Sequence, residues 1–423
     1  MTLSKIRQTT GIVLILLVLV VTQQRSDYDM TDPIEKVRAY TRWQEFDYGT
    51  WMGSALTLKF SVGTLNIPNY LDGEEQRKLV FNHLELLTEL NQLNNEIAAI
   101  YANPNIQDPD SVAARLMQEQ AGLKNQIKLQ QPLVEAVIQN QISAVVGDFG
   151  LGLGNQPMPP LLYHSTSLPM ALIVSPREEI KQIADISVMP ELTLAEITRL
   201  EESVASGLNV SALVDEVGGV GVYPTMVAQT TNLNWLVETI AHEWIHNYLT
   251  LRPLGILYFS TPEMRTINET TANIAGAEIG AAVIERFYPE FMPPPQESTT
   301  APVPGPPPTQ PAEPVFDFRA EMHETRVTAD ALLAEGKIEE AEAYMEDRRL
   351  VFWENGYQIR KLNQAYFAFH GAYADEPGGA AGEDPVGAAV RSLRAQSPNL
   401  ESFLNEISFV VSFEGLERLI QTD

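Results

Sequence analysis

The sequence predicts an α+β protein that is mainly helical, with a small sheet beside one central helix. Apolar residues recur at helical spacing along most of the chain. Two short runs, 170–177 and 218–230, have the apolar character of strands, and Pro224 places the second at a sheet edge. A proline-rich stretch, 289–314, separates two regular parts. With 423 residues the chain is long enough for two or three compact units.

These composition changes divide the chain into five expected parts. They are an N-terminal apolar segment, 1–26; an amphipathic helix and long helical hairpin, 27–150; a central part with the sheet, 151–288; the proline-rich linker, 289–314; and a helical C-terminal domain, 315–423.

The N-terminal segment has the pattern of an export signal. Lys5 and Arg7 precede the apolar run 11–22, and no further charge occurs before Arg25. No small-x-small cleavage site follows the run, so an uncleaved signal anchor is favoured over a cleaved signal peptide. We therefore expect a single-pass membrane protein with its main part outside the cytoplasm. Secretion after signal cleavage is the alternative.

The charge balance argues against nucleic acid as a partner. The chain has 28 basic and 55 acidic residues, a formal net charge of -27, whereas a phosphate backbone requires clustered Lys and Arg. The chain has no cysteine, which excludes disulfides and thiolate metal sites. Any bound transition metal must therefore use histidine and carboxylate ligands.

A heptad pattern predicts the helical hairpin. Its first arm covers 74–100, where apolar residues follow a 4-3 rhythm through Leu86, Leu90, Leu93, Ile97 and Ile100. Pro104 and Pro109 interrupt the pattern. A second arm is expected over 111–146, with a kink at Pro132.

The stretch TIAHEWIHNYLT, 239–250, contains the residues best suited to chemistry. We expect it to lie on a helix that starts near 232–234 and ends before Pro253. His242 and His246 are four apart, so both imidazoles share one helix face and could hold one metal ion. Glu243 would lie beside that ion, where it could take a proton from metal-bound water.

A catalytic zinc site needs a third protein ligand and an open fourth position. A further helix is expected from about 262 to 287, and it carries Glu269, 23 residues after His246. Asn273 follows one turn later on the same face. Glu278 lies deeper in that helix and is the rival third ligand.

The HExxH stretch joined to NETTAN, 268–273, resembles the gluzincins, the thermolysin-like zinc metallopeptidases. The resemblance covers about 218–287 and implies a zincin-like core that binds one Zn²⁺. It implies Glu269 as the third ligand and Asn273 as the residue that orients His242, although the family has an aspartate there. It also implies that the strand within 218–230 pairs with a peptide substrate.

The same resemblance implies a group that stabilises the oxyanion, supplied by the helical C-terminal part. Tyr373 and His370 are the principal candidates, with Tyr366 beside them in the same stretch. Tyr223, on the expected edge strand, is a further candidate.

The resulting expectation is a membrane-anchored, zinc-dependent peptidase with Glu243 as general base, whose endo- or exo-action is unassigned. The alternative is a non-catalytic, membrane-anchored scaffold in which the zinc site is structural or vestigial and the hairpin binds a partner. A fourth protein ligand would indicate structural zinc, whereas three ligands and an open position would indicate catalysis.

Overall fold

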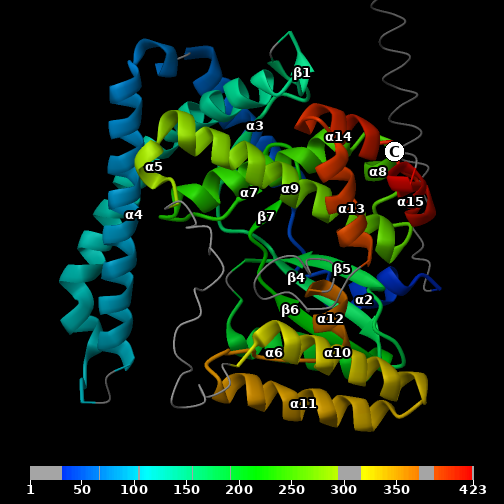
Figure 1. The fold of residues 1–423 in the computed structure, drawn as a ribbon. Helices are drawn as coiled ribbons and strands as arrows, with labels where there is room; N and C mark the ends of the chain where they lie inside the picture. The colour runs from blue at the N-terminus through cyan, green and yellow to red at the C-terminus, as the bar shows by residue number, and fades with distance from the viewer. Residues whose placement is uncertain are drawn as a thin grey trace, which may run out of the picture.

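The computed structural model describes residues 31–65, 67–102, 105–154, 156–190, 192–293, 316–370 and 385–421 (Figure 1). It confirms the α+β, mainly helical class, because the described strands are short and form small sheets between longer helices. The helices before the sheets are α2 (Pro33–Thr41), α3 (Tyr48–Leu65), α4 (Gly73–Ala102) and α5 (Pro109–Asp148). Those within and after them are α6 (Leu194–Leu208), α7 (Leu233–Leu249), α8 (Pro253–Ile256), α9 (Pro262–Phe287), α10 (Phe318–Ala334), α11 (Ile338–Glu354), α12 (Gln364–His370), α13 (Pro385–Gln396), α14 (Leu400–Ile407) and α15 (Phe413–Gln421).

The predicted membrane-spanning anchor is wrong for the part of the chain that the structure describes. No helix among those residues is both long enough and apolar enough to cross a bilayer. The apolar run 11–22, on which the single-pass location also depended, lies outside the described residues, as does most of the linker 289–314.

The predicted helical hairpin is present as α4 and α5, whose arms stand at one side of the molecule (Figure 1). Leu90 of the predicted heptad series is buried between the two arms with Ile127, whereas Leu87 is buried in place of Leu86, which is only partly buried. The second half of α5 leaves the hairpin and joins the main core, where Ile138 and Ile142 pack with α7 and α9. The hairpin is therefore continuous with the layer that contains the HExxH helix.

An antiparallel sheet with the order β5-β4-β6 forms the second layer. Its strands are β4 (Met170–Pro176), β5 (Ala184–Val188) and β6 (Val210–Asp215). Leu172 pairs with Ile186 on one side and Val214 on the other. Leu172 faces a core shared with α2 and α6, whereas its neighbour Ile173 faces a core shared with α10, α11 and α12. Both sheet faces are thus covered, which explains the continuous apolar run of β4.

The second predicted strand is a hairpin rather than a single strand. Residues 218–230 form β7 (Gly219–Val220) and β8 (Thr225–Val227), paired antiparallel through Val220 and Met226. β8 also pairs in parallel with β3 (Tyr163–Ser165), so β7 is the edge strand of this sheet. A two-stranded ribbon of β1 (Gly152–Leu153) and β2 (Gln156–Pro157) lies before it.

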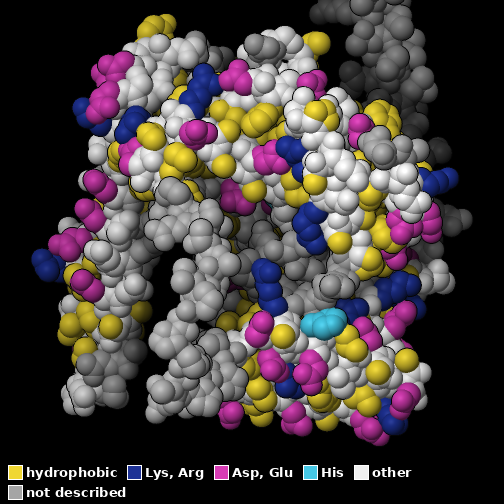
Figure 2. All heavy atoms as spheres, in the orientation of Figure 1, with side chains coloured by type: hydrophobic (Ala, Val, Ile, Leu, Met, Phe, Trp, Pro, Cys, Tyr) yellow, Lys and Arg dark blue, Asp and Glu magenta, His cyan; other side chains and the backbone are white. Residues whose placement is uncertain are grey.

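The C-terminal helices divide between the two layers. Helices α10 to α12 cover the sheet of β4, and Gly336 turns the chain between α10 and α11 with a φ of 75°. Helices α13 to α15 pack on α9 and complete the main core (Figure 1). On the face drawn in Figure 2, acidic and basic side chains are interspersed over the described residues.

A buried ionic network fixes α3, α5 and β3 to one another. The Glu135 carboxylate pairs with Lys59 Nζ, lies 3.0 Å from His164 Nδ1 and accepts from the Ser165 N–H at 2.8 Å. Gln131 Nε2 donates to the same carboxylate at 2.7 Å. Burial opposes ionisation of Glu135, but the charge of Lys59 and the contact with His164 outweigh it and lower its pKa to about 2.

Glu135→Gln should destabilise the fold, because it leaves the buried charge of Lys59 without its counter-ion. The depressed pKa corresponds to about 3 kcal/mol relative to an unfolded value of about 4.3. That contribution is complete above about pH 5 and is lost as the pH falls towards 2. Urea unfolding should therefore show a cost of about 3 kcal/mol at pH 7 and a smaller cost at pH 3. Glu119→Gln, at an exposed pair on the same helix, is the control and should change stability by less than about 0.5 kcal/mol. Equal stability of the two variants at pH 7 would contradict the role of this network.

Candidate metal centre

Two helices with well-defined starts present the candidate ligands. Asn232 caps α7 by accepting a hydrogen bond from the Trp235 N–H, and Thr261 caps α9 by accepting one from the Met264 N–H. These caps fix where each helix begins, and hence which residues face the neighbouring helix.

Small residues bring α7 and α9 close together. A Cβ at position 276 would lie 3.0 Å from the His242 Cβ, and a Cβ at position 280 would lie 3.0 Å from the Glu238 Cα. Gly276 and Gly280 are one turn apart on α9, and glycine at both positions lets the two backbones approach. Because position 280 meets 238 and position 276 meets 242, the helices run antiparallel.

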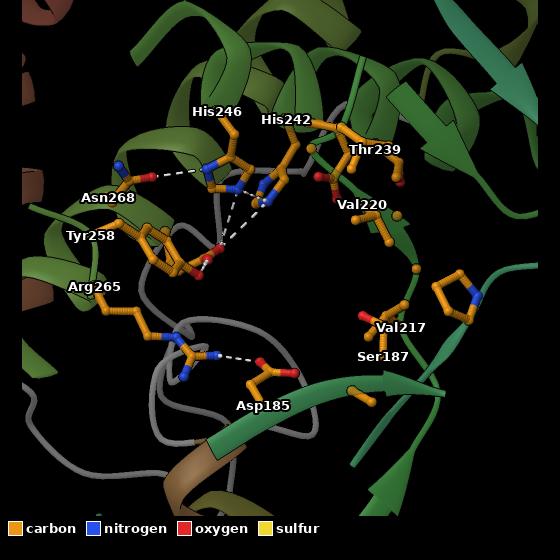
Figure 3. Close-up of a pocket in the computed structure, with 18 of the residues that line it drawn as sticks. Asp185, Ser187, Val217, Val220, Thr239, His242, His246, Tyr258, Arg265 and Asn268 are labelled. Carbon is orange, nitrogen blue, oxygen red and sulfur yellow. Dashed lines mark hydrogen bonds and ion pairs between the residues drawn. The ribbon is translucent and has the colours of Figure 1, made fainter. Parts of the chain in front are cut away.

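The two helices bring His242, His246 and Glu269 to one point, as the sequence predicted. The two histidine Nε2 atoms are 3.1 Å apart, and Glu269 Oε2 lies 3.6 Å from His242 Nε2 and 3.5 Å from His246 Nε2. A tetrahedral zinc ion with bonds of about 2.0–2.1 Å needs ligand atoms about 3.3 Å apart. The three atoms therefore have the spacing of a metal site (Figure 3).

The Glu269 carboxylate shows why a cation fits there. Its side chain is 2% exposed; Oε1 accepts from the Tyr258 hydroxyl, whereas Oε2 is buried without a hydrogen-bond donor. Burial opposes its ionisation, but the charges of His246 and His242 outweigh burial and hold its pKa well below the usual value. Burial alone would lower the pKa of His246, yet the charge of Glu269 raises it to about 9. A buried anionic oxygen directed at two imidazoles is a group that a divalent cation satisfies.

Asn268, rather than Asn273, orients a histidine in this structure. His246 Nδ1 lies 2.8 Å from Asn268 Oδ1, and Asn268 Nδ2 donates to the Leu254 carbonyl at 3.3 Å. This contact fixes the ring so that Nε2 faces the metal position. Asn273 lines the cleft, but no hydrogen bond joins it to His242 among the described residues. Asn268 belongs to the NETTAN stretch, but its contact with His246 depends on how α7 and α9 pack, so the sequence alone does not predict it.

Glu243 lies beside the ligand group and not in it. Its side chain is buried against β7, where a Cβ at position 219 would lie 2.5 Å from Glu243 Oε1 and one at 221 would lie 2.9 Å from His246 Cβ. Burial raises the pKa of the Glu243 carboxyl, although His242 and His246 oppose this effect. Asn247 Nδ2 donates to the Val222 carbonyl at 3.2 Å and so fastens the turn between β7 and β8 to α7.

The ligand group opens into a cleft of about 850 Å³ between the two layers. Its walls come from α7 and α9, the edge strand β7, strand β5 and the end of α12, and Figure 3 shows labelled side chains around this space. Tyr258, which the sequence did not identify, lines the cleft next to the ligands, and its ring centroid is 6.2 Å from that of His246.

The residues predicted to stabilise the oxyanion do not all lie together in the structure. His370 lines the cleft, with Nε2 2.9 Å from Asp215 Oδ2, and its ring lies 4.2 Å from that of Tyr366. Tyr223 donates its hydroxyl to the Pro160 carbonyl. Tyr373 lies outside the described residues.

Glu278, the alternative third ligand, forms an ion pair away from the two histidines. Its carboxylate forms a two-pronged ion pair with Arg394 of α13, at 2.7 and 2.9 Å. The ligand group of the described residues contains Glu269 instead.

Comparisons with protein-family models, with curated proteins and with solved structures find no match to this chain.

Glu269→Gln should weaken zinc binding by about a hundredfold or more, because an amide does not supply the anionic oxygen between the imidazoles. Isothermal titration calorimetry of the purified protein with Zn²⁺ measures the effect. Glu278→Gln, on the same helix, is the matched control and should bind zinc like the unmodified protein. Equal affinity of both variants would show that Glu269 is not a ligand.

Gly219→Ala should lower the free energy of unfolding by about 1–3 kcal/mol, since the added methyl group meets the buried Glu243 carboxylate. Gly122→Ala is the control, because no atom lies within 4 Å of the added Cβ in this exposed part of α5. It should be neutral or stabilising by up to about 1 kcal/mol. Thermal or urea unfolding compares the two, and an unaffected Gly219→Ala variant would contradict the close approach of β7 to α7.

Proposed function

We propose that this chain is a zinc-dependent peptidase that hydrolyses peptide bonds in the cleft between its two layers. The observation that carries the proposal is the convergence of His242, His246 and Glu269 at the wall of an open cleft, with the Glu243 carboxyl beside them. A site closed by protein on every side would indicate a structural ion, whereas this group faces a large cavity.

The donor set suits zinc. Two imidazole nitrogens and one carboxylate oxygen form a ligand group typical of catalytic zinc, and the chain has no cysteine for a thiolate site. When bound, zinc would supply Lewis acidity and lower the pKa of its water. Asn268 would hold His246 in the tautomer that binds metal through Nε2.

Glu243 is positioned to move the proton. A buried carboxyl with a raised pKa is better matched to proton transfer near neutral pH than an exposed one. In the proposed reaction its carboxylate accepts a proton from the attacking water and returns it to the leaving amine nitrogen. Gly219 and Gly221 have no side chains, so the backbone of 219–221 can lie directly against Glu243 and His246. This contact holds the Glu243 carboxyl beside the metal ligands.

Two groups in the cleft can donate hydrogen bonds to a developing oxyanion. Tyr258 donates its hydroxyl hydrogen to Glu269 Oε1, next to the metal position, and would turn this one donor to the oxyanion during the reaction. His370 comes from α12 and lies 2.9 Å through Nε2 from Asp215 Oδ2 of β6, which orients the ring. We assign the oxyanion role to Tyr258 and a supporting role to His370.

The substrate would lie along β7. This strand is the edge of its sheet and lines the cleft through residues 218–222. An extended peptide added to it would place its backbone in front of Glu243. A structural zinc site would call for a fourth protein ligand, and the described residues offer three in this group.

Glu243→Gln should keep zinc affinity unchanged and lower kcat/KM by about a hundredfold to ten-thousandfold, because the amide cannot accept a proton. Metal analysis and cleavage of a peptide library by the purified protein give the two readouts. Glu202→Gln, exposed on α6, is the control and should retain full activity. If the unmodified protein binds no metal, or Glu243→Gln cuts equally well, the peptidase proposal is wrong.

A further inference from the structure

Helix α9 presents a row of three residues to the cleft. Arg265, Glu269 and Asn273 all line it and are spaced four apart, so they lie one above another on one face of the helix. Arg265 is one turn, about 6 Å along the axis, from the proposed metal ligand. A cationic side chain therefore stands next to the position where the peptide bond would be cut.

The environment of Arg265 is unusual for a positive charge. The residue is 8% exposed, and Nη1 donates to Gln182 Oε1. Nη2 lies 4.0 Å from Asp185 Oδ2, beyond hydrogen-bond distance, and the guanidinium carbon is 5.8 Å from the Tyr258 ring centroid. In Figure 3 Arg265 lies beyond Tyr258 as seen from the histidines, and its guanidinium points towards Asp185 across the lower part of the cleft.

Most of the charged side chains that line the cleft are carboxylates. Arg265 is the one Lys or Arg among the described residues that line the cleft, whereas Asp185, Glu216, Glu238 and Glu243 are acidic. Glu238 meets α9 at position 280, which is 15 residues beyond Arg265 and hence about 22 Å away along the axis. Arg265 is therefore the one guanidinium or ammonium group of the described cleft wall to which a substrate carboxylate could bind, in competition with Asp185.

We propose that Arg265 is a specificity-determining residue that binds a substrate carboxylate, so that the site favours peptides with a carboxylate close to the scissile bond. The inference rests on the peptidase function proposed above. The guanidinium lies 5.8 Å from the Tyr258 ring, whose centroid is 6.2 Å from that of His246, so a carboxylate bound by Arg265 belongs to a residue within a few positions of the cut. The carboxylate is therefore either the C-terminal α-carboxylate of a short product or the side chain of Asp or Glu near the cut.

The geometry explains how the substrate carboxylate competes with Asp185. A carboxylate at hydrogen-bond distance from a guanidinium, about 2.8 Å, interacts more strongly than one at the observed 4.0 Å. The weakly hydrated, planar guanidinium also suits recognition of a carboxylate in a partly buried position. Asp185 is then the counter-ion of Arg265 until a substrate carboxylate displaces it from that role.

The test uses matched acetylated peptides that differ in one carboxylate. One pair has a free C-terminus or a C-terminal amide, and a second pair has Glu or Gln at each position beside the cut, so the two sources are distinguished. We expect the unmodified zinc-loaded protein to cleave the acid member of one pair with a kcat/KM about tenfold higher than its neutral partner.

Arg265→Gln should abolish that preference by lowering kcat/KM for the acid peptide about tenfold, with zinc binding unchanged. Arg286→Gln, also on α9 but exposed and paired with Asp148, is the matched control and should keep the preference. Should Arg265→Gln fail to fold, Asp185→Asn remains informative: removing the competing carboxylate should increase the preference for the acid peptide.

A binding measurement separates this inference from the peptidase proposal. Calorimetry on the zinc-loaded Glu243→Gln protein compares the acid and neutral peptides without turnover, and we expect tighter binding of the acid member. If peptides are cleaved but acid and neutral members are treated alike, the role of Arg265 is wrong while the peptidase function stands. If the acid member binds more tightly, through Arg265, but no peptide is cleaved, the peptidase function is wrong and the carboxylate site stands.

Discussion

The close packing of α7 against α9 is the constraint on which the rest of the site depends. Gly276 and Gly280 have no side chains, so the backbone of α9 can lie against His242 and Glu238. Only at this separation does the Glu269 carboxylate reach the Nε2 atoms of both histidines. The same packing orients Asn268 towards His246. One helix contact thus determines the ligand triangle and the hydrogen bond that supports it.

The two three-stranded sheets supply the remaining walls of the cleft. Strand β7 closes one side of the cleft because Gly219 and Gly221 let it approach Glu243 and His246. The sheet of β4 carries Asp185, which faces Arg265, and Asp215, which holds His370. The groups proposed for proton transfer, oxyanion stabilisation and substrate recognition therefore reach the cleft from different parts of the chain, and their arrangement depends on both hydrophobic cores being intact.

Local sequence patterns were sufficient to predict the long helices and part of the candidate site. Periodicity and caps gave α4, α5, α7 and α9 close to their observed bounds, and the i, i+4 spacing put His242 and His246 on one face. The roles of Asn268, Tyr258 and Arg265 could not be read in this way. Each role depends on side-chain contacts between α7, α9, β5 and the segment after α8, and these contacts are determined by tertiary packing. The apolar character of 218–230 predicts a single strand, whereas in the structure Pro224 lies in the turn that joins β7 to β8.

The central claim is that three side chains hold one zinc ion and leave one position open to the cleft. A crystal structure of the zinc-loaded protein with anomalous differences recorded at the zinc edge tests it most directly. The account predicts a single strong peak about 2.0–2.1 Å from His242 Nε2, His246 Nε2 and Glu269 Oε2, with a water as the fourth ligand. A peak elsewhere, or a fourth ligand supplied by the protein, would contradict it.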